Sequence, residues 1–350
     1  MKNDLLKLWI TTILSFYLGL ISAQNTFELI IEDTSTIKRD RISYDVLEVE
    51  DGFLLTSIYL GGKEDFALTK IDKQGNVLWD KTFEVGTWTE FKPYIIKTQN
   101  KNEYILAFQS FSFQNISLTS TLTVVYKINA KGDILWEKIL ETSNSIGKMV
   151  LLPNNTILIE DRNDGEIHYL YFLSTDGKLQ KEVIIEKNEF FIVHGIAIYD
   201  NSIYLCGSYD GDTQTSFLDK YDLEGNLIYS TGLFYGDVYH QRIMKVFKKE
   251  DKYFFITADR ELFQFDPLTG VYNKIDEDFE NGINEQDKVQ PYQGRVKHFV
   301  VTSNNEILAH SEHSVDNNLS PYGRSKGVMI EIYDNEYKLK SYKFYVKDDR

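Results

Sequence analysis

Residues 66–83 read FALTKIDKQGNVLWDKTF, and residues 124–140 read VVYKINAKGDILWEKIL. Each stretch consists of two short runs rich in β-branched and aromatic residues, with a glycine-containing turn between them. Gly75 and Gly132, next to Asn or Asp, permit the positive φ of a tight hairpin. Each stretch therefore predicts a β-hairpin, and their similarity predicts an internal repeat.

Weaker copies of this hairpin occur at residues 169–185, 217–233, 262–275 and 328–346. The six turns are separated by 57, 45, 48, 45 and 66 residues, which fits one four-stranded antiparallel sheet per repeat. No long helix is indicated. We therefore expect an all-β fold, a six-bladed β-propeller of four-stranded antiparallel blades, with a seven-bladed propeller as the alternative.

Two inner strands precede each hairpin, joined by turns of Asp, Asn, Gly and Lys. The predicted pairs are 44–49 with 53–59, 94–98 with 104–110, 148–152 with 156–160, 194–199 with 203–208, 243–247 with 253–257, and 296–302 with 306–311. Residues 26–32 predict one further strand that joins the last blade. A closed ring would leave no apolar blade face unpaired, so residues 24–350 are predicted to form a single domain.

Residues 71–81, IDKQGNVLWDK, resemble the repeat of bacterial quinoprotein-type (PQQ-like) propellers, whose outer strands carry a glycine followed four residues later by a tryptophan. The matching pairs are Gly75 with Trp79 and Gly132 with Trp136, whereas other copies have Lys181, Tyr229 and Lys340 in place of the tryptophan. The resemblance covers the architecture of residues 40–347 and implies tryptophans packed between neighbouring blades. It does not imply binding of the quinone.

The N-terminus has the pattern of a secretory signal peptide. Lys2 and Lys7 precede an apolar run from residue 8 to residue 21, and Ser22-Ala23 provide a small-residue cleavage site. The alternative is an uncleaved membrane anchor. No cysteine near this site could accept a lipid, so we expect an exported protein, periplasmic or extracellular, without a stable membrane anchor.

Composition describes a folded acidic protein. The 350 residues include 53 acidic and 38 basic ones, and 42% are hydrophobic. Cleavage after Ala23 would leave 36 basic and 52 acidic residues, a net charge of −16, which argues against nucleic acid as a partner. Cys206 is the single cysteine, so no internal disulfide is possible, and its apolar neighbours predict a core position.

Sequence motifs for catalysis are absent: there is no nucleophile elbow, Walker loop, zinc helix or full EF-hand loop. Residues 161–166, DRNDGE, are rich in oxygen ligands, but their spacing differs from a calcium loop and fits a hairpin turn better. His310 and His313 would point to opposite faces of a strand, which disfavours a shared metal. We predict no catalytic residue, no metal and no cofactor.

One set of residues suggests a ligand site. Aligned by repeat, the starts of the six innermost strands all carry basic residues, and these are Arg41, Lys92, Lys148, His194, Arg242 and Arg295. Such a cationic ring at the mouth of the central channel could bind a carboxylate, sulfate or phosphate group. The alternative is that these are solvated strand ends paired with local acids.

Two function classes remain open. The first is a non-enzymatic binding or scaffold propeller for an extracytoplasmic glycan, peptide or protein, and the missing catalytic motifs favour it. The second is a six-bladed enzyme, either a calcium-dependent sugar lactonase or a quinone-dependent sugar dehydrogenase. A lactonase centre needs converging acidic side chains, which the mostly basic strand starts do not supply.

Overall fold

The computed structural model describes residues 41–59, 66–83, 93–114, 117–142, 145–162, 167–187, 189–209, 215–233, 242–258, 261–275, 296–301, 306–316, 324–334 and 339–346. Every regular element within these ranges is a β-strand, and the strands form six four-stranded antiparallel sheets. The fold is a six-bladed β-propeller, which confirms the fold predicted from the repeat.

The chain divides into two compact units, residues 1–95 and 96–350. The first unit contains the first blade, whose strand order is β1-β2-β3-β4. Its strands are β1 (Arg41–Val49), β2 (Gly52–Tyr59), β3 (Phe66–Asp72) and β4 (Val77–Phe83). The predicted strand at residues 26–32 lies outside the described residues.

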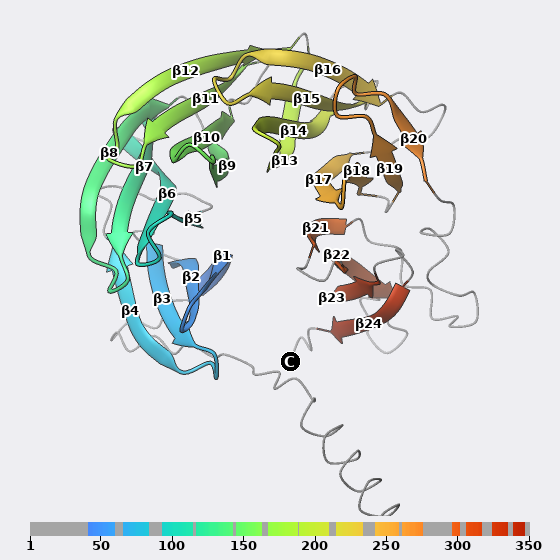
Figure 1. The fold of residues 1–350 in the computed structure, drawn as a ribbon. Helices are drawn as coiled ribbons and strands as arrows, with labels where there is room; N and C mark the ends of the chain where they lie inside the picture. Colours follow the sequence, from blue (N-terminus) through green and yellow to red (C-terminus); the bar gives the residue numbers. More distant parts are fainter. Residues whose placement is uncertain are drawn as a thin grey trace, which may run out of the picture. The chain divides into compact units, whose positions relative to one another are not determined.

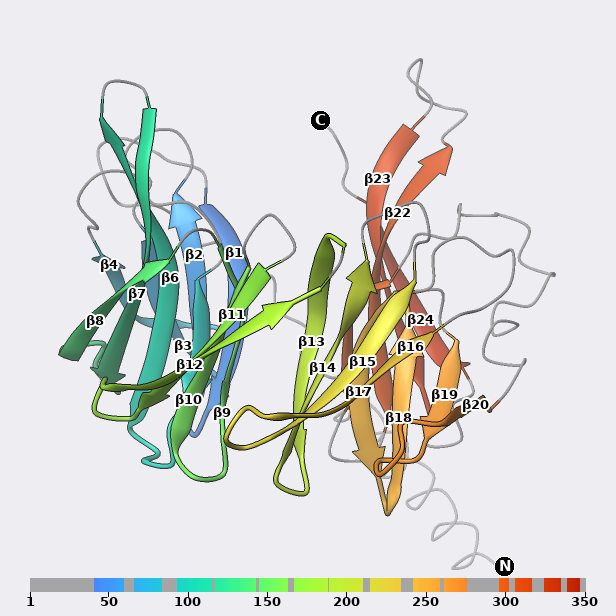
Figure 2. The same ribbon diagram turned by 90° about the horizontal axis from the view of Figure 1, so that it is seen from above.

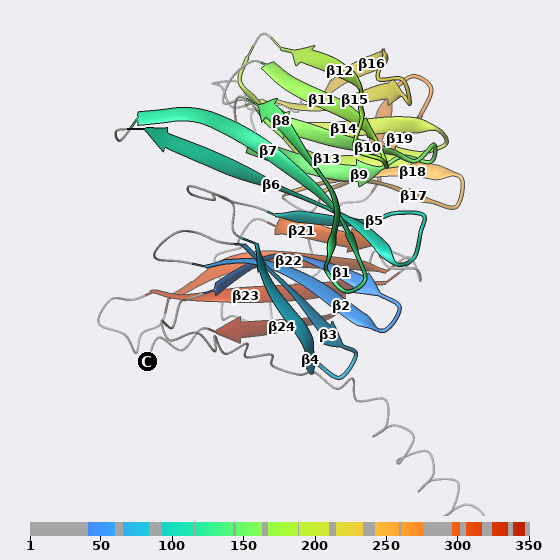
Figure 3. The same ribbon diagram turned by 90° about the vertical axis from the view of Figure 1, so that its left-hand side faces the viewer.

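The second unit contains the other five blades, and each runs in chain order from its inner to its outer strand (Figure 1). The second blade comprises β5 (Tyr94–Lys97), whose first residues belong to the first unit, β6 (Glu103–Gln114), β7 (Ser117–Asn129) and β8 (Ile134–Thr142). The third comprises β9 (Ser145–Leu151), β10 (Thr156–Arg162), β11 (Ile167–Ser174) and β12 (Leu179–Glu186). The hairpin of β6 and β7 is longer than predicted and projects from its blade (Figure 3).

The fourth blade comprises β13 (Phe191–Tyr199), β14 (Ser202–Tyr209), β15 (Ser216–Asp222) and β16 (Leu227–Leu233), which twist progressively from the inside outward (Figure 2). The fifth comprises β17 (Ile243–Lys249), β18 (Lys252–Thr257), β19 (Leu262–Phe265) and β20 (Tyr272–Lys274). The sixth comprises β21 (Val296–Val301), β22 (Ile307–Asp316), β23 (Arg324–Tyr333) and β24 (Leu339–Val346).

The outer hairpins owe their shape to the repeated turn. Gly75 and Gly132 have φ angles of 88° and 76°, values that a side chain would strain. The Oδ1 atom of Asp72 accepts the backbone N–H groups of Gln74 and Asn76 at 2.9 and 2.8 Å, and the Asn129 side chain plays the same role in the second blade. The turn chemistry read from the sequence is therefore confirmed.

The core of the second unit consists of apolar layers between successive blades. One layer joins the third and fourth blades and includes Leu158, Phe172 and Phe217. A second layer joins the fourth and fifth blades around Tyr204 and Phe255, and a third joins the fifth and sixth. Burying these faces is what holds neighbouring blades together, since the chain has no disulfide.

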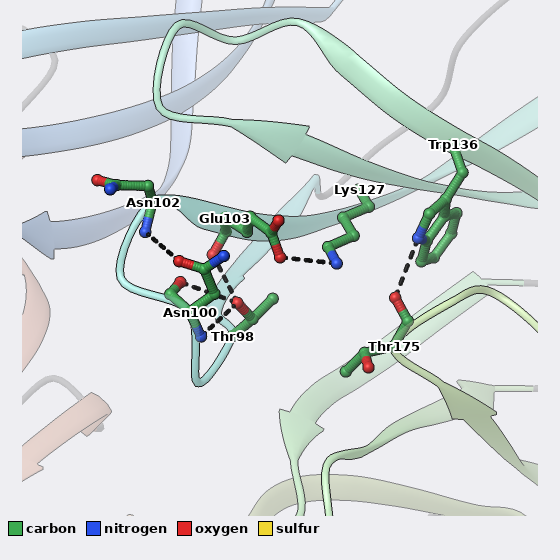
Figure 4. Close-up of polar contacts among 7 residues, drawn as sticks. All are labelled: Thr98, Asn100, Asn102, Glu103, Lys127, Trp136 and Thr175. Atoms are coloured by element: carbon green, nitrogen blue, oxygen red, sulfur yellow. Dashed lines mark hydrogen bonds and ion pairs between the residues drawn. The ribbon is translucent and has the colours of Figure 1, made fainter.

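Trp136 packs between blades as predicted. Its Nε1 donates a hydrogen bond to the carbonyl oxygen of Thr175 at 3.0 Å (Figure 4). Its ring also covers Gly177 in the turn of the third blade. A Cβ atom on Gly177 would lie only 3.1 Å from the ring. The tryptophan of one outer strand thus anchors the turn of the next blade, although the indole remains partly exposed.

We expect Trp136→Ala to lower the free energy of unfolding by about 2–3 kcal/mol, less than for a fully buried tryptophan. The loss combines a cavity beside Gly177 with the missing hydrogen bond to Thr175. Urea denaturation measures it. Ile139→Ala, at a side chain 46% exposed on the same strand, is the control and should change stability by about 0.5 kcal/mol or less. Equal midpoints for both variants would contradict the anchoring role.

Candidate functional site

The inner strands of the third, fourth and fifth blades share an irregularity. In each, one residue is skipped in the pairing with the next strand, so that a β-bulge forms at Gly147 in β9, His194 in β13 and Met244 in β17. Bulges change the direction of the side chains beside them and are common near binding sites. Since β13 contacts both β9 and β17, the three bulges lie on neighbouring strands (Figure 1).

Two lysines follow equivalent bulges on either side of β13. Lys148 follows the bulge in β9 and Lys245 follows the bulge in β17, while the corresponding residue of β13 is Gly195. A Cβ atom on Gly195 would lie 2.8 Å from the carbonyl oxygen of Met244 and 2.9 Å from the sulfur of Cys206. The fourth blade therefore presents backbone, without a side chain, between the two lysines.

The two lysine charges are close enough to influence each other. Burial lowers the pKa of Lys245, and the positive charge of Lys148 lowers it further. The Lys245 ammonium donates to the carbonyl oxygen of Phe299 at 3.0 Å, and neither lysine forms an ion pair with a described residue. Two neighbouring ammonium groups that form no ion pair with a described residue form a place where an anion would be stabilised.

Cys206 lies beneath the lysine pair and is fully buried, in agreement with the predicted core position. Burial raises the pKa of its thiol to about 12, although the charges of Lys148 and Lys245 act in the opposite direction. The thiol is therefore protonated at neutral pH and packs against Gly195.

His194 is the bulged residue of β13. It directly precedes Gly195, the residue that corresponds to Lys148 and Lys245. Its Nε2 atom is 2.9 Å from the hydroxyl oxygen of Ser208 on β14. Arg242 precedes β17 by one residue and is half-buried, and its carbonyl oxygen accepts the N–H of Ala258 at 2.8 Å. His194 therefore lies on the inner strand between those of the two lysines, and Arg242 directly precedes the inner strand that carries Lys245.

The structure locates part of the predicted cationic ring. Lys148 and His194 lie on the inner strands β9 and β13 and Arg242 directly precedes the inner strand β17, but the three occupy different positions relative to the bulge. Arg41 is the first residue of β1 in the other unit, where only its backbone is described, and Lys92 and Arg295 lie outside the described residues. Their role as ligand-binding residues stays a prediction.

Lys245 was missed because the repeats were aligned by the starts of their strands. In register with the bulges, Lys148 corresponds to Lys245 and not to Arg242, which lies three residues earlier. The missing signal was the bulge itself, which a single sequence does not display. Asp45 occupies the same position in β1, so the register does not place a cation in every blade.

A second group of ionisable residues is buried behind the bulge of β9. The Nδ1 atom of His168 lies 2.6 Å from Glu160 Oε1, its Nε2 atom lies 3.1 Å from the carbonyl oxygen of Phe191, and its ring stacks on the Phe191 ring. Each ring nitrogen of the imidazole therefore has one buried partner, the Glu160 carboxyl group or the Phe191 carbonyl oxygen. This pair links the third blade to the fourth.

Asp161, the next residue on β10, is fully buried, and neither of its carboxylate oxygens has a hydrogen-bond partner among the described residues. Burial raises its pKa to about 7, and the charge of Glu160 adds to the effect. The sequence suggested Asp161 as part of a loop rich in oxygen ligands, but residues 163–166 lie outside the described residues. Within the described ranges, no cluster of three or more His, Cys, Asp or Glu residues could hold a metal ion.

Comparison with known proteins shows only the fold. No protein-family model and no curated protein matches the chain. A structure from a study of two prolyl endopeptidases matches with a TM-score of 0.52 and 8% identity, over 87% of this chain and 42% of that chain. The Pan2 WD40 domain of Neurospora crassa matches with a TM-score of 0.48 and 14% identity, over 88% of this chain and 76% of that one. A Bacteroides caccae protein matches with a TM-score of 0.48 and 11% identity, over 85% and 92%.

No helix among the described residues is long and apolar enough to cross a membrane.

Proposed function

We propose that the protein is an exported bacterial binding propeller of PQQ-like repeats that holds an anionic group of a glycan, peptide or protein partner at its inner strands. The convergence of Lys148 and Lys245 across Gly195 carries this proposal. The signal-peptide pattern of residues 1–23 supports export, and the glycine–tryptophan pairs support the repeat type.

The chemistry of the lysine pair suits a singly or doubly charged oxyanion. Holding two ammonium groups together without a carboxylate costs free energy, and an anion placed between them removes that cost. The carboxylate of an acidic sugar or acidic side chain, or a sulfate or phosphate ester, would accept hydrogen bonds from both groups.

We expect the protein to bind oligogalacturonate more tightly than a neutral galactan of equal length, measured by isothermal titration calorimetry. Binding should weaken as salt rises, because screening shortens the range of the attraction. Binding should also weaken at an alkaline pH that is lower than the pH at which an ordinary lysine loses its proton. The reason is that the pKa of Lys245 is lowered.

The double variant Lys148→Glu/Lys245→Glu should abolish this binding. Its matched control is Lys101→Glu/Lys131→Glu, which makes the same change in net charge at exposed turns of the second blade. Thermal unfolding of both variants establishes that they fold. If both double variants bind the acidic oligosaccharide with equal affinity, the lysine pair is not the binding site.

A further inference from the structure

The fifth blade carries a hollow of about 670 Å3 on its outer strands. Val271, Asn273 and Ile275 alternate along β20 and its flanks, so their side chains share one face of the sheet. Gln264 of β19 is the direct pairing partner of Asn273 and faces the same way. The volume lies within the range of about 300–1,000 Å3 that is typical of small-molecule sites.

The hollow lies where other blades are filled. The pairs equivalent to Gln264 with Asn273 are Lys127 with Trp136, Phe172 with Lys181, and Lys220 with Tyr229. In each of these blades the outer-strand residue contacts the turn of the following blade. Trp136 bonds the carbonyl of Thr175, Lys181 donates to the carbonyl of Glu224 at 2.6 Å, and Tyr229 packs against Gly270.

The short side chain of Asn273 cannot make such a contact, and the sixth repeat has Asn335-Glu336 where the others have a glycine. The turn that begins at Asp266 is also one residue longer than the others, because its Gly270 N–H bonds a carbonyl four residues back instead of three. The hollow is thus the site of a missing anchor residue.

The polar groups in the hollow are available to a ligand. The carboxamides of Gln264 and Asn273 make no hydrogen bond to a described residue, and each offers both a donor and an acceptor. The Thr269 hydroxyl at the edge, by contrast, is already engaged, because it donates to Asp266 Oδ2 at 2.7 Å. Val271 and Ile275, which are 65% and 39% exposed, flank Asn273 with apolar surface.

The charges around the hollow are balanced. Asp251 and Asp266 contribute two negative charges, and Lys252 and Lys220, whose ammonium donates to the Pro267 carbonyl at 2.7 Å, contribute two positive ones. Hydrogen bonds from the Leu268 backbone and the Thr269 side chain lower the pKa of Asp266, so its carboxylate is ionised at neutral pH. A ligand without charge, with many hydroxyl groups and an apolar face, matches this surface best.

We propose that this hollow binds a neutral saccharide segment, as a second ligand site independent of the lysine pair on the inner strands. Vicinal hydroxyl groups both donate and accept, so they pair with the facing carboxamides of Gln264 and Asn273. The C–H face of the sugar ring lies against Val271 and Ile275. In the second blade, Trp136 contacts the turn of the following blade. In the fifth blade, the saccharide occupies the equivalent place.

The test uses the full chain and a panel of neutral hexasaccharides: maltohexaose, cellohexaose, xylohexaose, mannohexaose and laminarihexaose. Isothermal titration calorimetry should show binding of at least one of them, with little dependence on salt because no charge is involved. Asn273→Trp, which copies the residue of the second blade, should fill the hollow and reduce affinity at least tenfold. Gln264→Ala/Asn273→Ala, which removes the carboxamides without adding bulk, should do the same.

Lys181→Trp is the matched control, because it places the same residue at the equivalent position of the third blade, outside the hollow. It should retain saccharide binding, and so should Lys148→Glu/Lys245→Glu. Absence of binding to every hexasaccharide overturns the proposal, as does unchanged affinity in Asn273→Trp. Binding of an uncharged extended peptide along β20 in place of any saccharide also overturns it, since that would identify the strand edge as the recognised feature.

Discussion

Asp161→Asn is expected to stabilise the protein at pH 8 by on the order of 3 kcal/mol and to leave its stability nearly unchanged at pH 4. The cause is the burial of a carboxylate whose two oxygens have no partner in the described part of the chain, with the charge of Glu160 nearby. The pKa of Asp161 is about 7 in the folded protein, against 3.8 for an ordinary aspartate. The folded state therefore keeps a proton that the unfolded chain releases.

The direction of the pH effect follows from that difference. Below about pH 4 the Asp161 carboxyl group is protonated in both the folded and the unfolded protein, so it does not change the free energy of unfolding. Between about pH 4 and pH 7 the unfolded chain ionises first, and the free energy of unfolding falls as pH rises. Above about pH 7 both states are ionised, and the loss of stability is complete.

Urea denaturation between pH 4 and pH 8 measures this effect, and the Asp161→Asn variant should show a flatter profile than the parent protein. Asp176→Asn is the control, because Asp176 is exposed and its pKa is lowered by hydrogen bonds to Ser174 and Lys178. A parent profile that does not fall between pH 4 and pH 7, or an equal slope in Asp161→Asn, would show that Asp161 is not a buried, unpaired acid.

Asp219→Asn is expected to have the opposite effect and to destabilise the protein by about 3–5 kcal/mol. Asp219 is also fully buried, but its carboxylate accepts hydrogen bonds from Lys187 at 2.6 Å and from Ser230 at 2.5 Å. Removing its charge leaves the nearly buried ammonium of Lys187 without a counter-ion. The denaturation midpoint at pH 7 measures the loss.

The pairing, and not the carboxylate alone, accounts for the expected loss. Asp219→Asn/Lys187→Met should recover part of the stability, because the unpaired ammonium is gone. Ser230→Ala, which removes only one hydrogen bond, should cost about 1 kcal/mol. If the double variant is no more stable than Asp219→Asn, the ion pair is not the source of the effect.

Asp161 and Asp219 show why the two buried acids could not be distinguished in the sequence. Asp219 lies in a predicted hairpin strand and Asp161 at the start of a predicted hairpin turn, yet each is fully buried. Their expected effects differ in sign because Lys187, directly after β12 of the third blade, reaches Asp219, while no described residue reaches Asp161. Contacts between blades decide whether a buried acid has a partner, and such contacts join residues far apart in the chain.

The repeat alone was sufficient to predict the six blades, the order of their strands and the contact of Trp136 with the following blade. Hairpins are local structures, and the Gly75 and Gly132 turns with their flanking alternation determine them within about twenty residues. Three conclusions from the sequence stay predictions. They are the single domain of residues 24–350, the export signal, and the expectation that the chain has no catalytic residue.

The tertiary structure decided which residues come together. The bulges of β9, β13 and β17 bring Lys148 beside Lys245, although alignment of strand starts had favoured Arg242. The hollow beside Asn273 is lined by residues of β19, β20 and the turns of the fifth blade, whose shape the sequence did not reveal. A hairpin follows from the conformational preferences of adjacent residues, whereas a bulge register or a gap between sheets follows from packing across blades, which no local pattern in the sequence encodes.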